Sequence, residues 1–445
     1  MKEKNRPNIL FILADDLGWG DVSYHGSINR TPNIDRLASR GIELDQHYVA
    51  PLCTPTRVSL LTGRYPGRFG THATSPSNPP VLPDGYDTLA ASLKEAGYET
   101  ALFGKWHLGS DPQFCPNEYG FDTSYGSLAG GVDPYNHRYK RGQYSRTWHR
   151  DGELIEEEGH VTDLITREAV EWIESREEPW FCYVPYTAVH IPVDAPEGWL
   201  DEYEHETYSK DEGKDRAWKR YAAYASHMDQ GVGQLIETLK RTCQLDETIV
   251  VFCGDNGAAG TGFYGGTGGE KYPGWSWETP GLGNNSPLRG EKGQFYEGGV
   301  RTPSIVSWPG TLRPRRIDYP LNIIDWAPTL LRLAQSERED PRWDGLDLWP
   351  LLAGERAELG ERSFFWNLRD EKFAARRGDW KLIADEGLSP ENPELFNLRS
   401  DPYEQIDLSK KRPEIVKELL EEIDHEHQKD GDTVRDDVDQ WSKWG

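Results

Sequence analysis

The sequence lacks any apolar run of about 18 residues, the length that a membrane-spanning helix needs. We therefore expect no membrane span. Near the N-terminus, Ile9–Ala14 follows a basic stretch and so looks like the core of a signal peptide. That run is short, however, and it ends in Asp15-Asp16 instead of a small-residue cleavage site. We interpret it as the first strand of the fold, and native export stays open.

Positive charge is also scarce. The chain has 50 Lys and Arg residues against 75 Asp and Glu residues, which gives a formal net charge of −25. Such an acidic surface repels nucleic acids and sulfated polymers at long range, so a general polyanion-binding surface is excluded. An anionic substrate must instead be held locally by a few well-placed cations. We expect neither nucleic acid nor a membrane as a partner.

Cysteine is rare, and its spacing shows no pairs. The five cysteines stand at positions 53, 115, 182, 243 and 253, and any disulfide scheme leaves one over. Cys182 and Cys253 fall inside apolar runs and are expected to be buried as small hydrophobic side chains. Internal repeats are absent too. At 445 residues the chain is too long for one small core and suits a large domain with a smaller partner.

Apolar runs of strand length alternate with amphipathic helical stretches through the first three quarters of the chain. This alternation is typical of an α/β fold whose mostly parallel sheet lies between helices. The expected strands are Asn8–Ala14, Thr100–Phe103, Trp180–Val184 and Thr248–Cys253. The expected helices are Ile34–Arg40, Thr88–Ala96, Asp163–Ser175, one within Trp218–Cys243, and Asn322–Ala334. Reactive residues that follow such strands should meet at one edge of the sheet.

The pattern changes after Asp340. A charged amphipathic helix is expected over Pro413–His427. Short strand-like segments separated by turns precede it at Phe364–Leu368, Phe373–Arg377, Trp380–Ala384 and Glu394–Asn397. We predict a large domain over residues 1–340 and a small α+β subdomain with an antiparallel sheet over residues 341–445.

The most informative segment runs from Cys53 to Arg64 and reads Cys-Thr-Pro-Thr-Arg-Val-Ser-Leu-Leu-Thr-Gly-Arg. Pro55 suits the first turn of a helix, where its missing N–H costs nothing, so Cys53 is expected near a helix N-terminus. The apolar residues that follow would give this helix one apolar face. Arg57 lies one turn further on and, with the N-terminal N–H groups, can bind an anion. A bare Cys-x-Pro would more often be a buried cysteine at a helix start, but the whole segment is far more specific.

Two pairs of polar residues follow expected strands. Asp15-Asp16 ends the first strand, and Asp255-Asn256 follows Thr248–Cys253. Carboxylate and amide oxygens at strand ends suit a hard divalent cation. Either pair alone is weak evidence, because Asp-Asp and Asp-Asn are common in turns and helix caps.

Cations and histidines follow other strands. Lys105 and His107 belong to Gly-Lys-Trp-His-Leu-Gly, and on an extended backbone their side chains would point to the same face. His190 follows Trp180–Val184, and Lys292 lies in Pro-Leu-Arg-Gly-Glu-Lys-Gly. Taken singly, a Lys-x-His pair is usually a solvated strand face, and a lone histidine is usually structural.

Together these segments resemble the type I sulfatase family over nearly the whole chain. In that family the cysteine of Cys-x-Pro-x-Arg is converted after translation to Cα-formylglycine, so the resemblance implies a formylglycine-generating or maturase enzyme as a partner. It also implies an alkaline-phosphatase-like large domain, a small C-terminal α+β subdomain, and hydrolysis of a sulfate ester on a sulfated carbohydrate. The segments Pro51–Pro55 and Thr187–His190 look closest to the arylsulfatase B type, which removes a 4-sulfate from N-acetylgalactosamine.

The resemblance implies a metal site and a substrate site. The cation, Ca²⁺ in preference to Mg²⁺ or Mn²⁺, would be bound by Asp15, Asp16, Asp255, Asn256 and the modified Cys53. Substrate contacts would come from Asn136 and His137. In some arylsulfatases a serine stands at what looks like the Asn136 position, so this sequence departs from them there.

The resemblance also implies a reaction scheme. A hydroxyl of hydrated formylglycine at position 53, polarised by the cation and Arg57, attacks sulfur. Lys105 and Lys292 hold the sulfuryl oxygens, and Lys292 takes this role in preference to Arg289. His190 protonates the departing sugar oxygen. His107 then accepts a proton from the remaining hydroxyl, which expels sulfate.

The segment Gly257–Gly283 is glycine-rich, with Tyr264, Tyr272, Trp275 and Trp277 interleaved. It is most simply a long loop over the site, where the aromatic side chains would stack on a sugar ring. A surface loop whose aromatic residues only pack together has equal weight.

Two alternatives to a sulfatase stay open. Related enzymes use the same formylglycine core on phosphorus, so a phosphonate monoester hydrolase or phosphodiesterase is the nearest rival. The other alternative is a non-catalytic protein that binds sulfated sugars and whose Cys53 is never modified. We favour the enzyme because every proposed catalytic position carries a competent residue.

Overall fold

The computed structural model describes residues 6–438 and 440, except for 178, 261–282, 339, 369–371 and 385–391. Its centre is a ten-stranded sheet in the order β11-β2-β10-β9-β1-β8-β4-β5-β6-β7. The middle strands run parallel and are β9 (Thr248–Gly254), β1 (Asn8–Ala14), β8 (Trp180–Pro185), β4 (Glu99–Lys105) and β5 (Thr123–Ser127). The flanking strands are β11 (Arg315–Ile317), β2 (Ile42–Leu44), β10 (Ser304–Ser307), β6 (Trp148–Arg150) and β7 (Glu153–Leu154). The predicted mostly parallel α/β sheet is confirmed.

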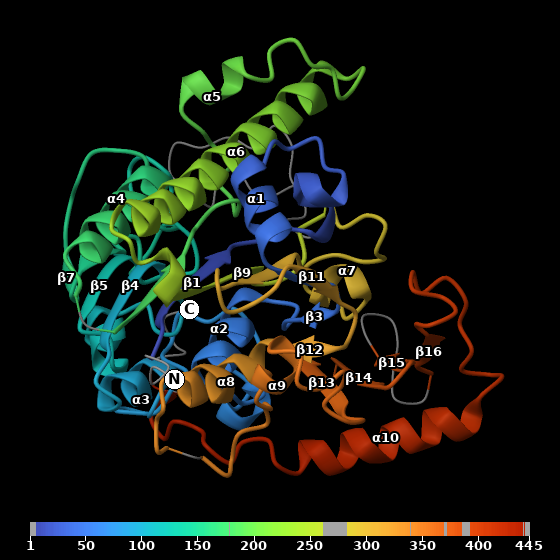
Figure 1. Ribbon diagram of the computed structural model, residues 1–445. Helices are drawn as coiled ribbons and strands as arrows, with labels where there is room; N and C mark the ends of the chain where they lie inside the picture. Colours follow the sequence, from blue (N-terminus) through green and yellow to red (C-terminus); the bar gives the residue numbers. More distant parts are fainter. Residues whose placement is uncertain are drawn as a thin grey trace.

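Helices cover both faces of this sheet (Figure 1). Successive β1 side chains point to opposite faces, so Phe11 lies in one core and Ile12 in the other. The first core is covered by α2 (Cys53–Thr62), α3 (Leu89–Glu95), α8 (Trp326–Leu333) and α9 (Trp349–Leu352). The second is covered by α1 (Pro32–Arg40), α4 (Val161–Glu174), α5 (Glu197–Asp201) and α6 (Glu212–Arg241). None of the described helices is both long and apolar enough to cross a membrane.

Several helices begin a few residues from the expected positions, among them α1, α4, α6 and α8. Helix α6 starts at Glu212, before the expected range, because the Asp211 carboxylate caps it by accepting a hydrogen bond from the backbone N–H of Lys214 at 2.9 Å. The stretch expected to be helical from Asn322 begins instead with a 3₁₀ turn at Ile323–Asp325, which passes into α8. Polar caps of this kind lie outside the apolar pattern that predicted the helices.

The C-terminal region forms a second, smaller sheet. Its antiparallel strands are β13 (Ser363–Leu368), β14 (Lys372–Arg377), β15 (Trp380–Ala384) and β16 (Glu394–Asn397). One face packs on Tyr48, Phe295 and Val300 of the large domain, and the other is covered by α10 (Pro413–His427). The predicted antiparallel subdomain is confirmed. Its boundary at residue 341 stays a prediction, and α9 still packs into the large core.

Two short pieces connect these parts near the site. The pair β3 (His47–Tyr48) and β12 (Leu321–Asn322) forms a small parallel ladder. The short helix α7 (Glu297–Val300) follows the segment that carries Lys292. Because Phe295 and Val300 pack on the small sheet, that sheet supports the Lys292 segment from behind.

Candidate active site

Helix α2 starts at the candidate nucleophile. Cys53 is its first residue, and Gly63 ends it in the left-handed conformation with φ 68°. All ten residues of α2 are buried, so the expectation of a single apolar face is wrong. The helix lies inside the molecule, and its polar side chains find partners there. Thr54, for example, donates its hydroxyl to the carbonyl oxygen of His107 at 3.2 Å.

The candidate residues on strands meet at one edge of the sheet. Asp15 and Asp16 follow β1, Asp255 follows β9, His190 lies beyond the end of β8, and Lys105 ends β4. These four strands are neighbours in the sheet. The convergence expected at the carboxyl ends of parallel strands is thus observed.

Four of the five proposed metal ligands, namely those with a carboxylate or a thiol group, converge. One ligand atom each from Asp15, Asp16, Cys53 and Asp255 lies within 4.8 Å of the others, and all four residues are buried. Asn256 donates its amide N–H to Asp16 Oδ1 at 2.7 Å, while its own Oδ1 is buried without a hydrogen-bond partner. A buried acceptor without a donor beside three carboxylates fits a hard divalent cation.

Cations balance these carboxylates. The ion pairs are Lys105 Nζ with Asp15 Oδ2 at 2.6 Å, Lys292 Nζ with Asp16 Oδ1 at 2.6 Å, and Arg57 Nη2 with Asp255 Oδ2 at 2.9 Å. We call these six residues, together with Cys53 and Asn256, the catalytic cluster. Arg289, the other cation considered for the sulfate, lies elsewhere. It stacks on the Tyr296 ring at 3.9 Å and donates to the carbonyl oxygen of Glu404 at 2.7 Å.

The cluster shifts the protonation of its members. Burial alone would raise the pKa of Asp16, but Lys292 and His190 outweigh it and hold that pKa well below its usual range. Burial, followed by the charge of Asp255, raises the pKa of the Cys53 thiol. The Cys53 Sγ lies 3.5 Å from Asp15 Oδ1.

His190 presents one nitrogen to the cluster. Its Nδ1 donates to the carbonyl oxygen of Ile191 at 2.7 Å, which fixes the tautomer and ring orientation. Its Nε2 lies 3.8 Å from Asp16 Oδ2. Burial, and next the charge of Lys292, holds the pKa of His190 well below its usual range. A histidine in this state is neutral unless an anion binds beside it.

His107 lies beside the cluster, but its backbone is not extended as we expected from the sequence. Strand β4 ends at Lys105, and His107 has φ 62°, so the backbone there is left-handed and not extended. Its ring packs against Gly130, where an added Cβ would come within 2.2 Å of Nε2. Its Nδ1 is buried without a hydrogen-bond partner. Burial and the charge of Lys105 lower its pKa well below the usual range.

The two predicted substrate residues lie in the connection between β5 and β6. Asn136 is exposed, and its side-chain oxygen accepts the backbone N–H of Arg138 at 2.9 Å. His137 stacks on Trp148 at 4.9 Å, and its Nε2 is 2.9 Å from the carbonyl oxygen of Gly159. No hydrogen bond or ion pair among the described residues joins either to the cluster, and their role stays a prediction. The expected aromatic loop lies almost wholly in 261–282, outside the described residues.

The sequence reasoning missed a second buried set of charges next to Lys292. Lys381 Nζ lies 2.7 Å from Glu297 Oε1 and 2.9 Å from Glu404 Oε1. Tyr48 donates its hydroxyl to Glu297 at 2.8 Å and accepts a hydrogen bond from Arg376. We call these five residues the Glu297 network. Lys381 is 84 positions from Glu297 in the sequence, so no local motif could have revealed the pairing.

Comparison with known proteins identifies the family of the chain that carries this site. Residues 7–336 match the sulfatase family. The chain belongs to the sulfatase family. Residues 290–429 of this sulfatase also match the C-terminal region of N-sulphoglucosamine sulphohydrolase. The interpretation of the sequence as a formylglycine-type sulfatase, and hence as a sulfuric ester hydrolase, is confirmed.

Relatives of this sulfatase align over most of its length. Arylsulfatase J of Mus musculus is 32% identical over 94% of this chain and 75% of its own. N-acetylgalactosamine-6-sulfatase of Homo sapiens is 34% identical over 84% of this chain and 71% of its own. Among solved structures, Ps i-CgsB in complex with k-i-k-neocarrahexaose has a TM-score of 0.81 at 29% identity and covers 99% of this chain and 97% of that one.

The same fold occurs in the rival enzyme class. The phosphonate monoester hydrolase of Agrobacterium radiobacter matches with a TM-score of 0.66 at 19% identity, over 95% of this chain and 96% of that one. At this identity the likeness extends to the fold alone. The alkaline-phosphatase-like architecture is confirmed, and the family matched over residues 7–336 is that of the sulfatases.

Proposed function

We propose that this sulfatase removes sulfate from a carbohydrate, using formylglycine made from Cys53 and a divalent cation, Ca²⁺. The observation that carries the proposal is the place of the Cys53 Sγ, which stands in for the oxygens of formylglycine. It lies at the start of a buried helix, 3.5 Å from Asp15, in a cluster with three cations.

The cation would be held by Asp15, Asp16, Asp255 and Asn256, whose Oδ1 is the buried acceptor without a partner. When present, formylglycine supplies a hydrated aldehyde with a hydroxyl nucleophile, and the cation polarises the oxygens around it. An all-oxygen set of three carboxylates and one amide suits Ca²⁺, although the same ligands also accept Mg²⁺ or Mn²⁺.

The protein's own side chains have separate roles in the proposed reaction. Lys105 and Lys292 hold the sulfuryl oxygens, and Arg57 stabilises negative charge at position 53. His190, with Nε2 facing the cluster, donates the proton to the departing sugar oxygen once the anionic ester has bound. His107 accepts a proton near position 53. Its ring is buried and packs against Gly130, and both features hold it in place.

The carbohydrate as substrate class is supported by the relatives. The name of one relative, N-acetylgalactosamine-6-sulfatase, refers to a sulfated sugar, and the similar solved structure holds a neocarrahexaose. The 4-sulfate of N-acetylgalactosamine, expected from the sequence, stays a prediction. A maturation enzyme that oxidises Cys53 is a further partner that this function requires.

An intact-mass measurement combined with paired rates tests the proposal. We expect protein co-produced with a formylglycine-generating enzyme to be about 18 Da lighter than the sequence mass, from the atomic composition of the modification. The same protein should hydrolyse an aryl sulfate faster than the matching aryl phosphonate ester. An unmodified mass together with undiminished turnover, or a preference for the phosphonate, would refute it.

Metal removal provides a second test with a readout other than activity. Dialysis against a chelator should lower the melting temperature, and Ca²⁺ should restore it more effectively than Mg²⁺. At 100 times the dissociation constant the cation should contribute about 2.7 kcal/mol to the free energy of unfolding. An unchanged melting temperature in all three conditions would contradict a metal site at this cluster.

A further inference from the structure

A large cleft is lined in part by residues that stand a few positions from members of the catalytic cluster in the sequence. Its volume is about 900 Å³, within the range of pockets that hold small ligands. On one side, Asp45 and Gln46 follow β2 and Asp318 and Tyr319 follow β11. On the other, residues of the C-terminal subdomain such as Tyr403 close it. The cleft therefore lies between the two parts of the molecule.

The cleft opens at the same edge of the sheet as the catalytic cluster. Strand β2 is antiparallel to β10, and β10 is antiparallel to β9, so β2 runs in the same direction as β9. Strand β11 is parallel to β2. The carboxyl ends of β2 and β11 thus continue the edge at which Asp15 and Asp255 lie. A chain-like substrate could run along this edge from one site to the other.

Two segments border both sites. Trp19 lines the cleft three residues after Asp16, and Leu288 and Glu297 line it on either side of Lys292. Lys292 and Asp16 are themselves paired in the catalytic cluster at 2.6 Å. These two segments therefore connect the two sites along the chain.

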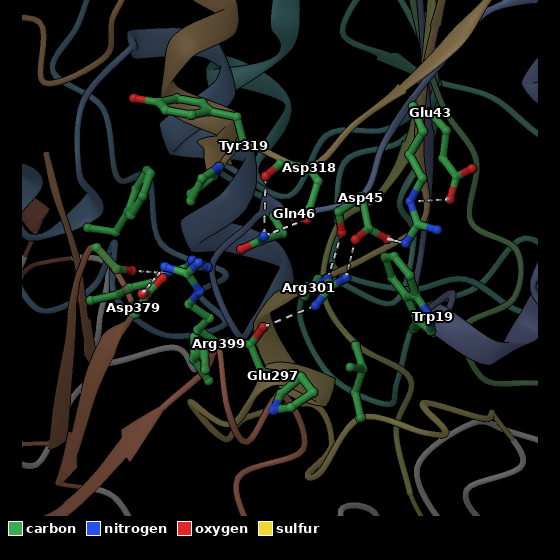
Figure 2. Close-up of a pocket in the computed structure, with 18 of the residues that line it drawn as sticks. Trp19, Glu43, Asp45, Gln46, Glu297, Arg301, Asp318, Tyr319, Asp379 and Arg399 are labelled. Atoms are coloured by element: carbon green, nitrogen blue, oxygen red, sulfur yellow. Dashed lines mark hydrogen bonds and ion pairs between the residues drawn. The ribbon is translucent and has the colours of Figure 1, made fainter. Parts of the chain in front are cut away.

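The charged groups of the cleft are largely neutralised by one another, as Figure 2 shows. Arg301 pairs with Asp45 at 3.0 Å and with Glu297 at 3.5 Å, and Gln46 donates to Asp318 at 2.6 Å. Carboxylates outnumber guanidinium groups among the residues that line the cleft. A second sulfate would have to displace an existing carboxylate partner, whereas sugar hydroxyls can donate to the same oxygens without separating charges.

Aromatic rings in the cleft provide apolar contacts for a sugar, in addition to the oxygens that can accept hydrogen bonds from its hydroxyls. The Tyr403 side chain is among the exposed large apolar groups, with 39% of the residue accessible, and Tyr319 is partly accessible. Such rings pack against the apolar faces of pyranose units. Trp19 is instead held between the His25 ring at 4.0 Å and Arg301 at 4.4 Å, and so forms part of the fixed wall. Among the described residues, no metal-type cluster of side chains lies in this cleft.

We propose that this cleft is a subsite for uncharged sugar units that adjoin the sulfated unit of the substrate. The proposal rests on the proposed function and makes it more specific. The substrate would be an oligosaccharide whose sulfated unit is followed by neutral sugars, and a densely sulfated chain would be disfavoured by the surplus of carboxylates.

A length series tests the subsite. The Tyr403→Ala variant should raise KM about ten-fold for a singly sulfated hexasaccharide with neutral flanking units, equivalent to the loss of one good stacking contact. Its kcat/KM for an aryl sulfate should stay within about two-fold of the parent. Ile406→Ala is the matched control, because Ile406 is in the same loop and 57% exposed but does not line the cleft. An equal change for both substrates, or for neither, would overturn the proposal.

A binding experiment separates this subsite from the proposed function. Protein carrying Cys53→Ala, which cannot turn over, would be titrated with an unsulfated galactose hexasaccharide and with its fully sulfated counterpart by NMR or calorimetry. We expect the neutral chain to bind and the addition of Tyr403→Ala to weaken it about ten-fold. Tighter binding of the fully sulfated chain, with no effect of Tyr403→Ala, would overturn the subsite even if aryl sulfate hydrolysis is intact. Absence of aryl sulfate hydrolysis in the parent would instead refute the proposed function.

Discussion

The catalytic cluster and the Glu297 network are both buried sets of charged residues, but they satisfy their polar atoms differently. In the Glu297 network the carboxylates meet a cation of the protein itself, since Lys381 contacts both Glu297 and Glu404. Beside the catalytic cluster, Asn256 Oδ1 and His107 Nδ1 are buried without hydrogen-bond partners. The first set pairs its charges within the folded chain and joins two parts of it, although Glu404 Oε1 has only the ion pair with Lys381 and no hydrogen bond. The second is arranged around groups that the chain must acquire.

The largest effect should come from a substitution in the catalytic cluster. Cys53→Ala is expected to lower kcat for an aryl sulfate by at least about 10⁴-fold, because the nucleophile can no longer form. The free energy of unfolding should change little. Cys182→Ala is the matched control, since that buried cysteine lies in β8 away from the cluster and should retain turnover. Activity in the Cys53→Ala protein equal to that of the control would end the proposed scheme.

His190→Gln should have the next largest effect, again without loss of stability. If His190 protonates the leaving group, kcat should fall about 10²–10⁴-fold for a sugar sulfate. The loss should be much smaller for an aryl sulfate with a good leaving group, because such a phenolate departs with little assistance. A parallel series of leaving groups checks this. An equal loss for every leaving group would assign His190 to positioning and not to proton transfer.

A variant of the Glu297 network should lose stability and keep most of its turnover, in contrast to the two variants above. Lys381→Met removes the cation that contacts both Glu297 and Glu404, while Glu297 keeps Arg301 at 3.5 Å. It is expected to lower the free energy of unfolding by about 3–5 kcal/mol. Its kcat per folded molecule should change less than ten-fold. Chemical denaturation and titrated active sites measure the two quantities, with the exposed Lys417→Met as the control. A stable Lys381→Met protein that has lost turnover would show that the two sets of charges are not separate.

The smallest effect concerns pH. Burial, together with the negative charge of Glu297, raises the pKa of Glu404 from an ordinary 4.5 to about 7, although the Lys381 ammonium acts in the opposite direction. The folded state then holds the proton more tightly, so this contribution to stability is complete below pH 4.5 and is lost as the pH rises through 7. In Glu404→Gln the free energy of unfolding should therefore decline less between pH 4.5 and pH 7, by up to about 3 kcal/mol. Melting curves at several pH values measure it, with the exposed Glu421→Gln as a control. A decline as steep in Glu404→Gln as in the parent would contradict this assignment.

Much of the fold could be predicted from the sequence because the strands and helices depend on the local spacing of apolar residues. The bounds of Asn8–Ala14 and Pro413–His427 agree with those expected, since each depends on apolar spacing over a few residues. Where a polar cap decided a boundary, as Asp211 does for α6, the apolar pattern placed it wrongly. The meeting of Asp15 and Asp255 was also predictable, because parallel strands bring their carboxyl ends to one edge.

The sequence by itself determined the family, the chemical identity of the groups that converge, and most strands and helices, because these depend on residue types and on short-range spacing. Only the tertiary structure decided that α2 is buried on every side, that His107 is left-handed, and that Asn136 is exposed. It alone also paired Lys381 with Glu297 and formed the cleft between the sheet edge and the C-terminal subdomain. These features arise where segments far apart in the chain pack together, and no local pattern records which segments will become neighbours.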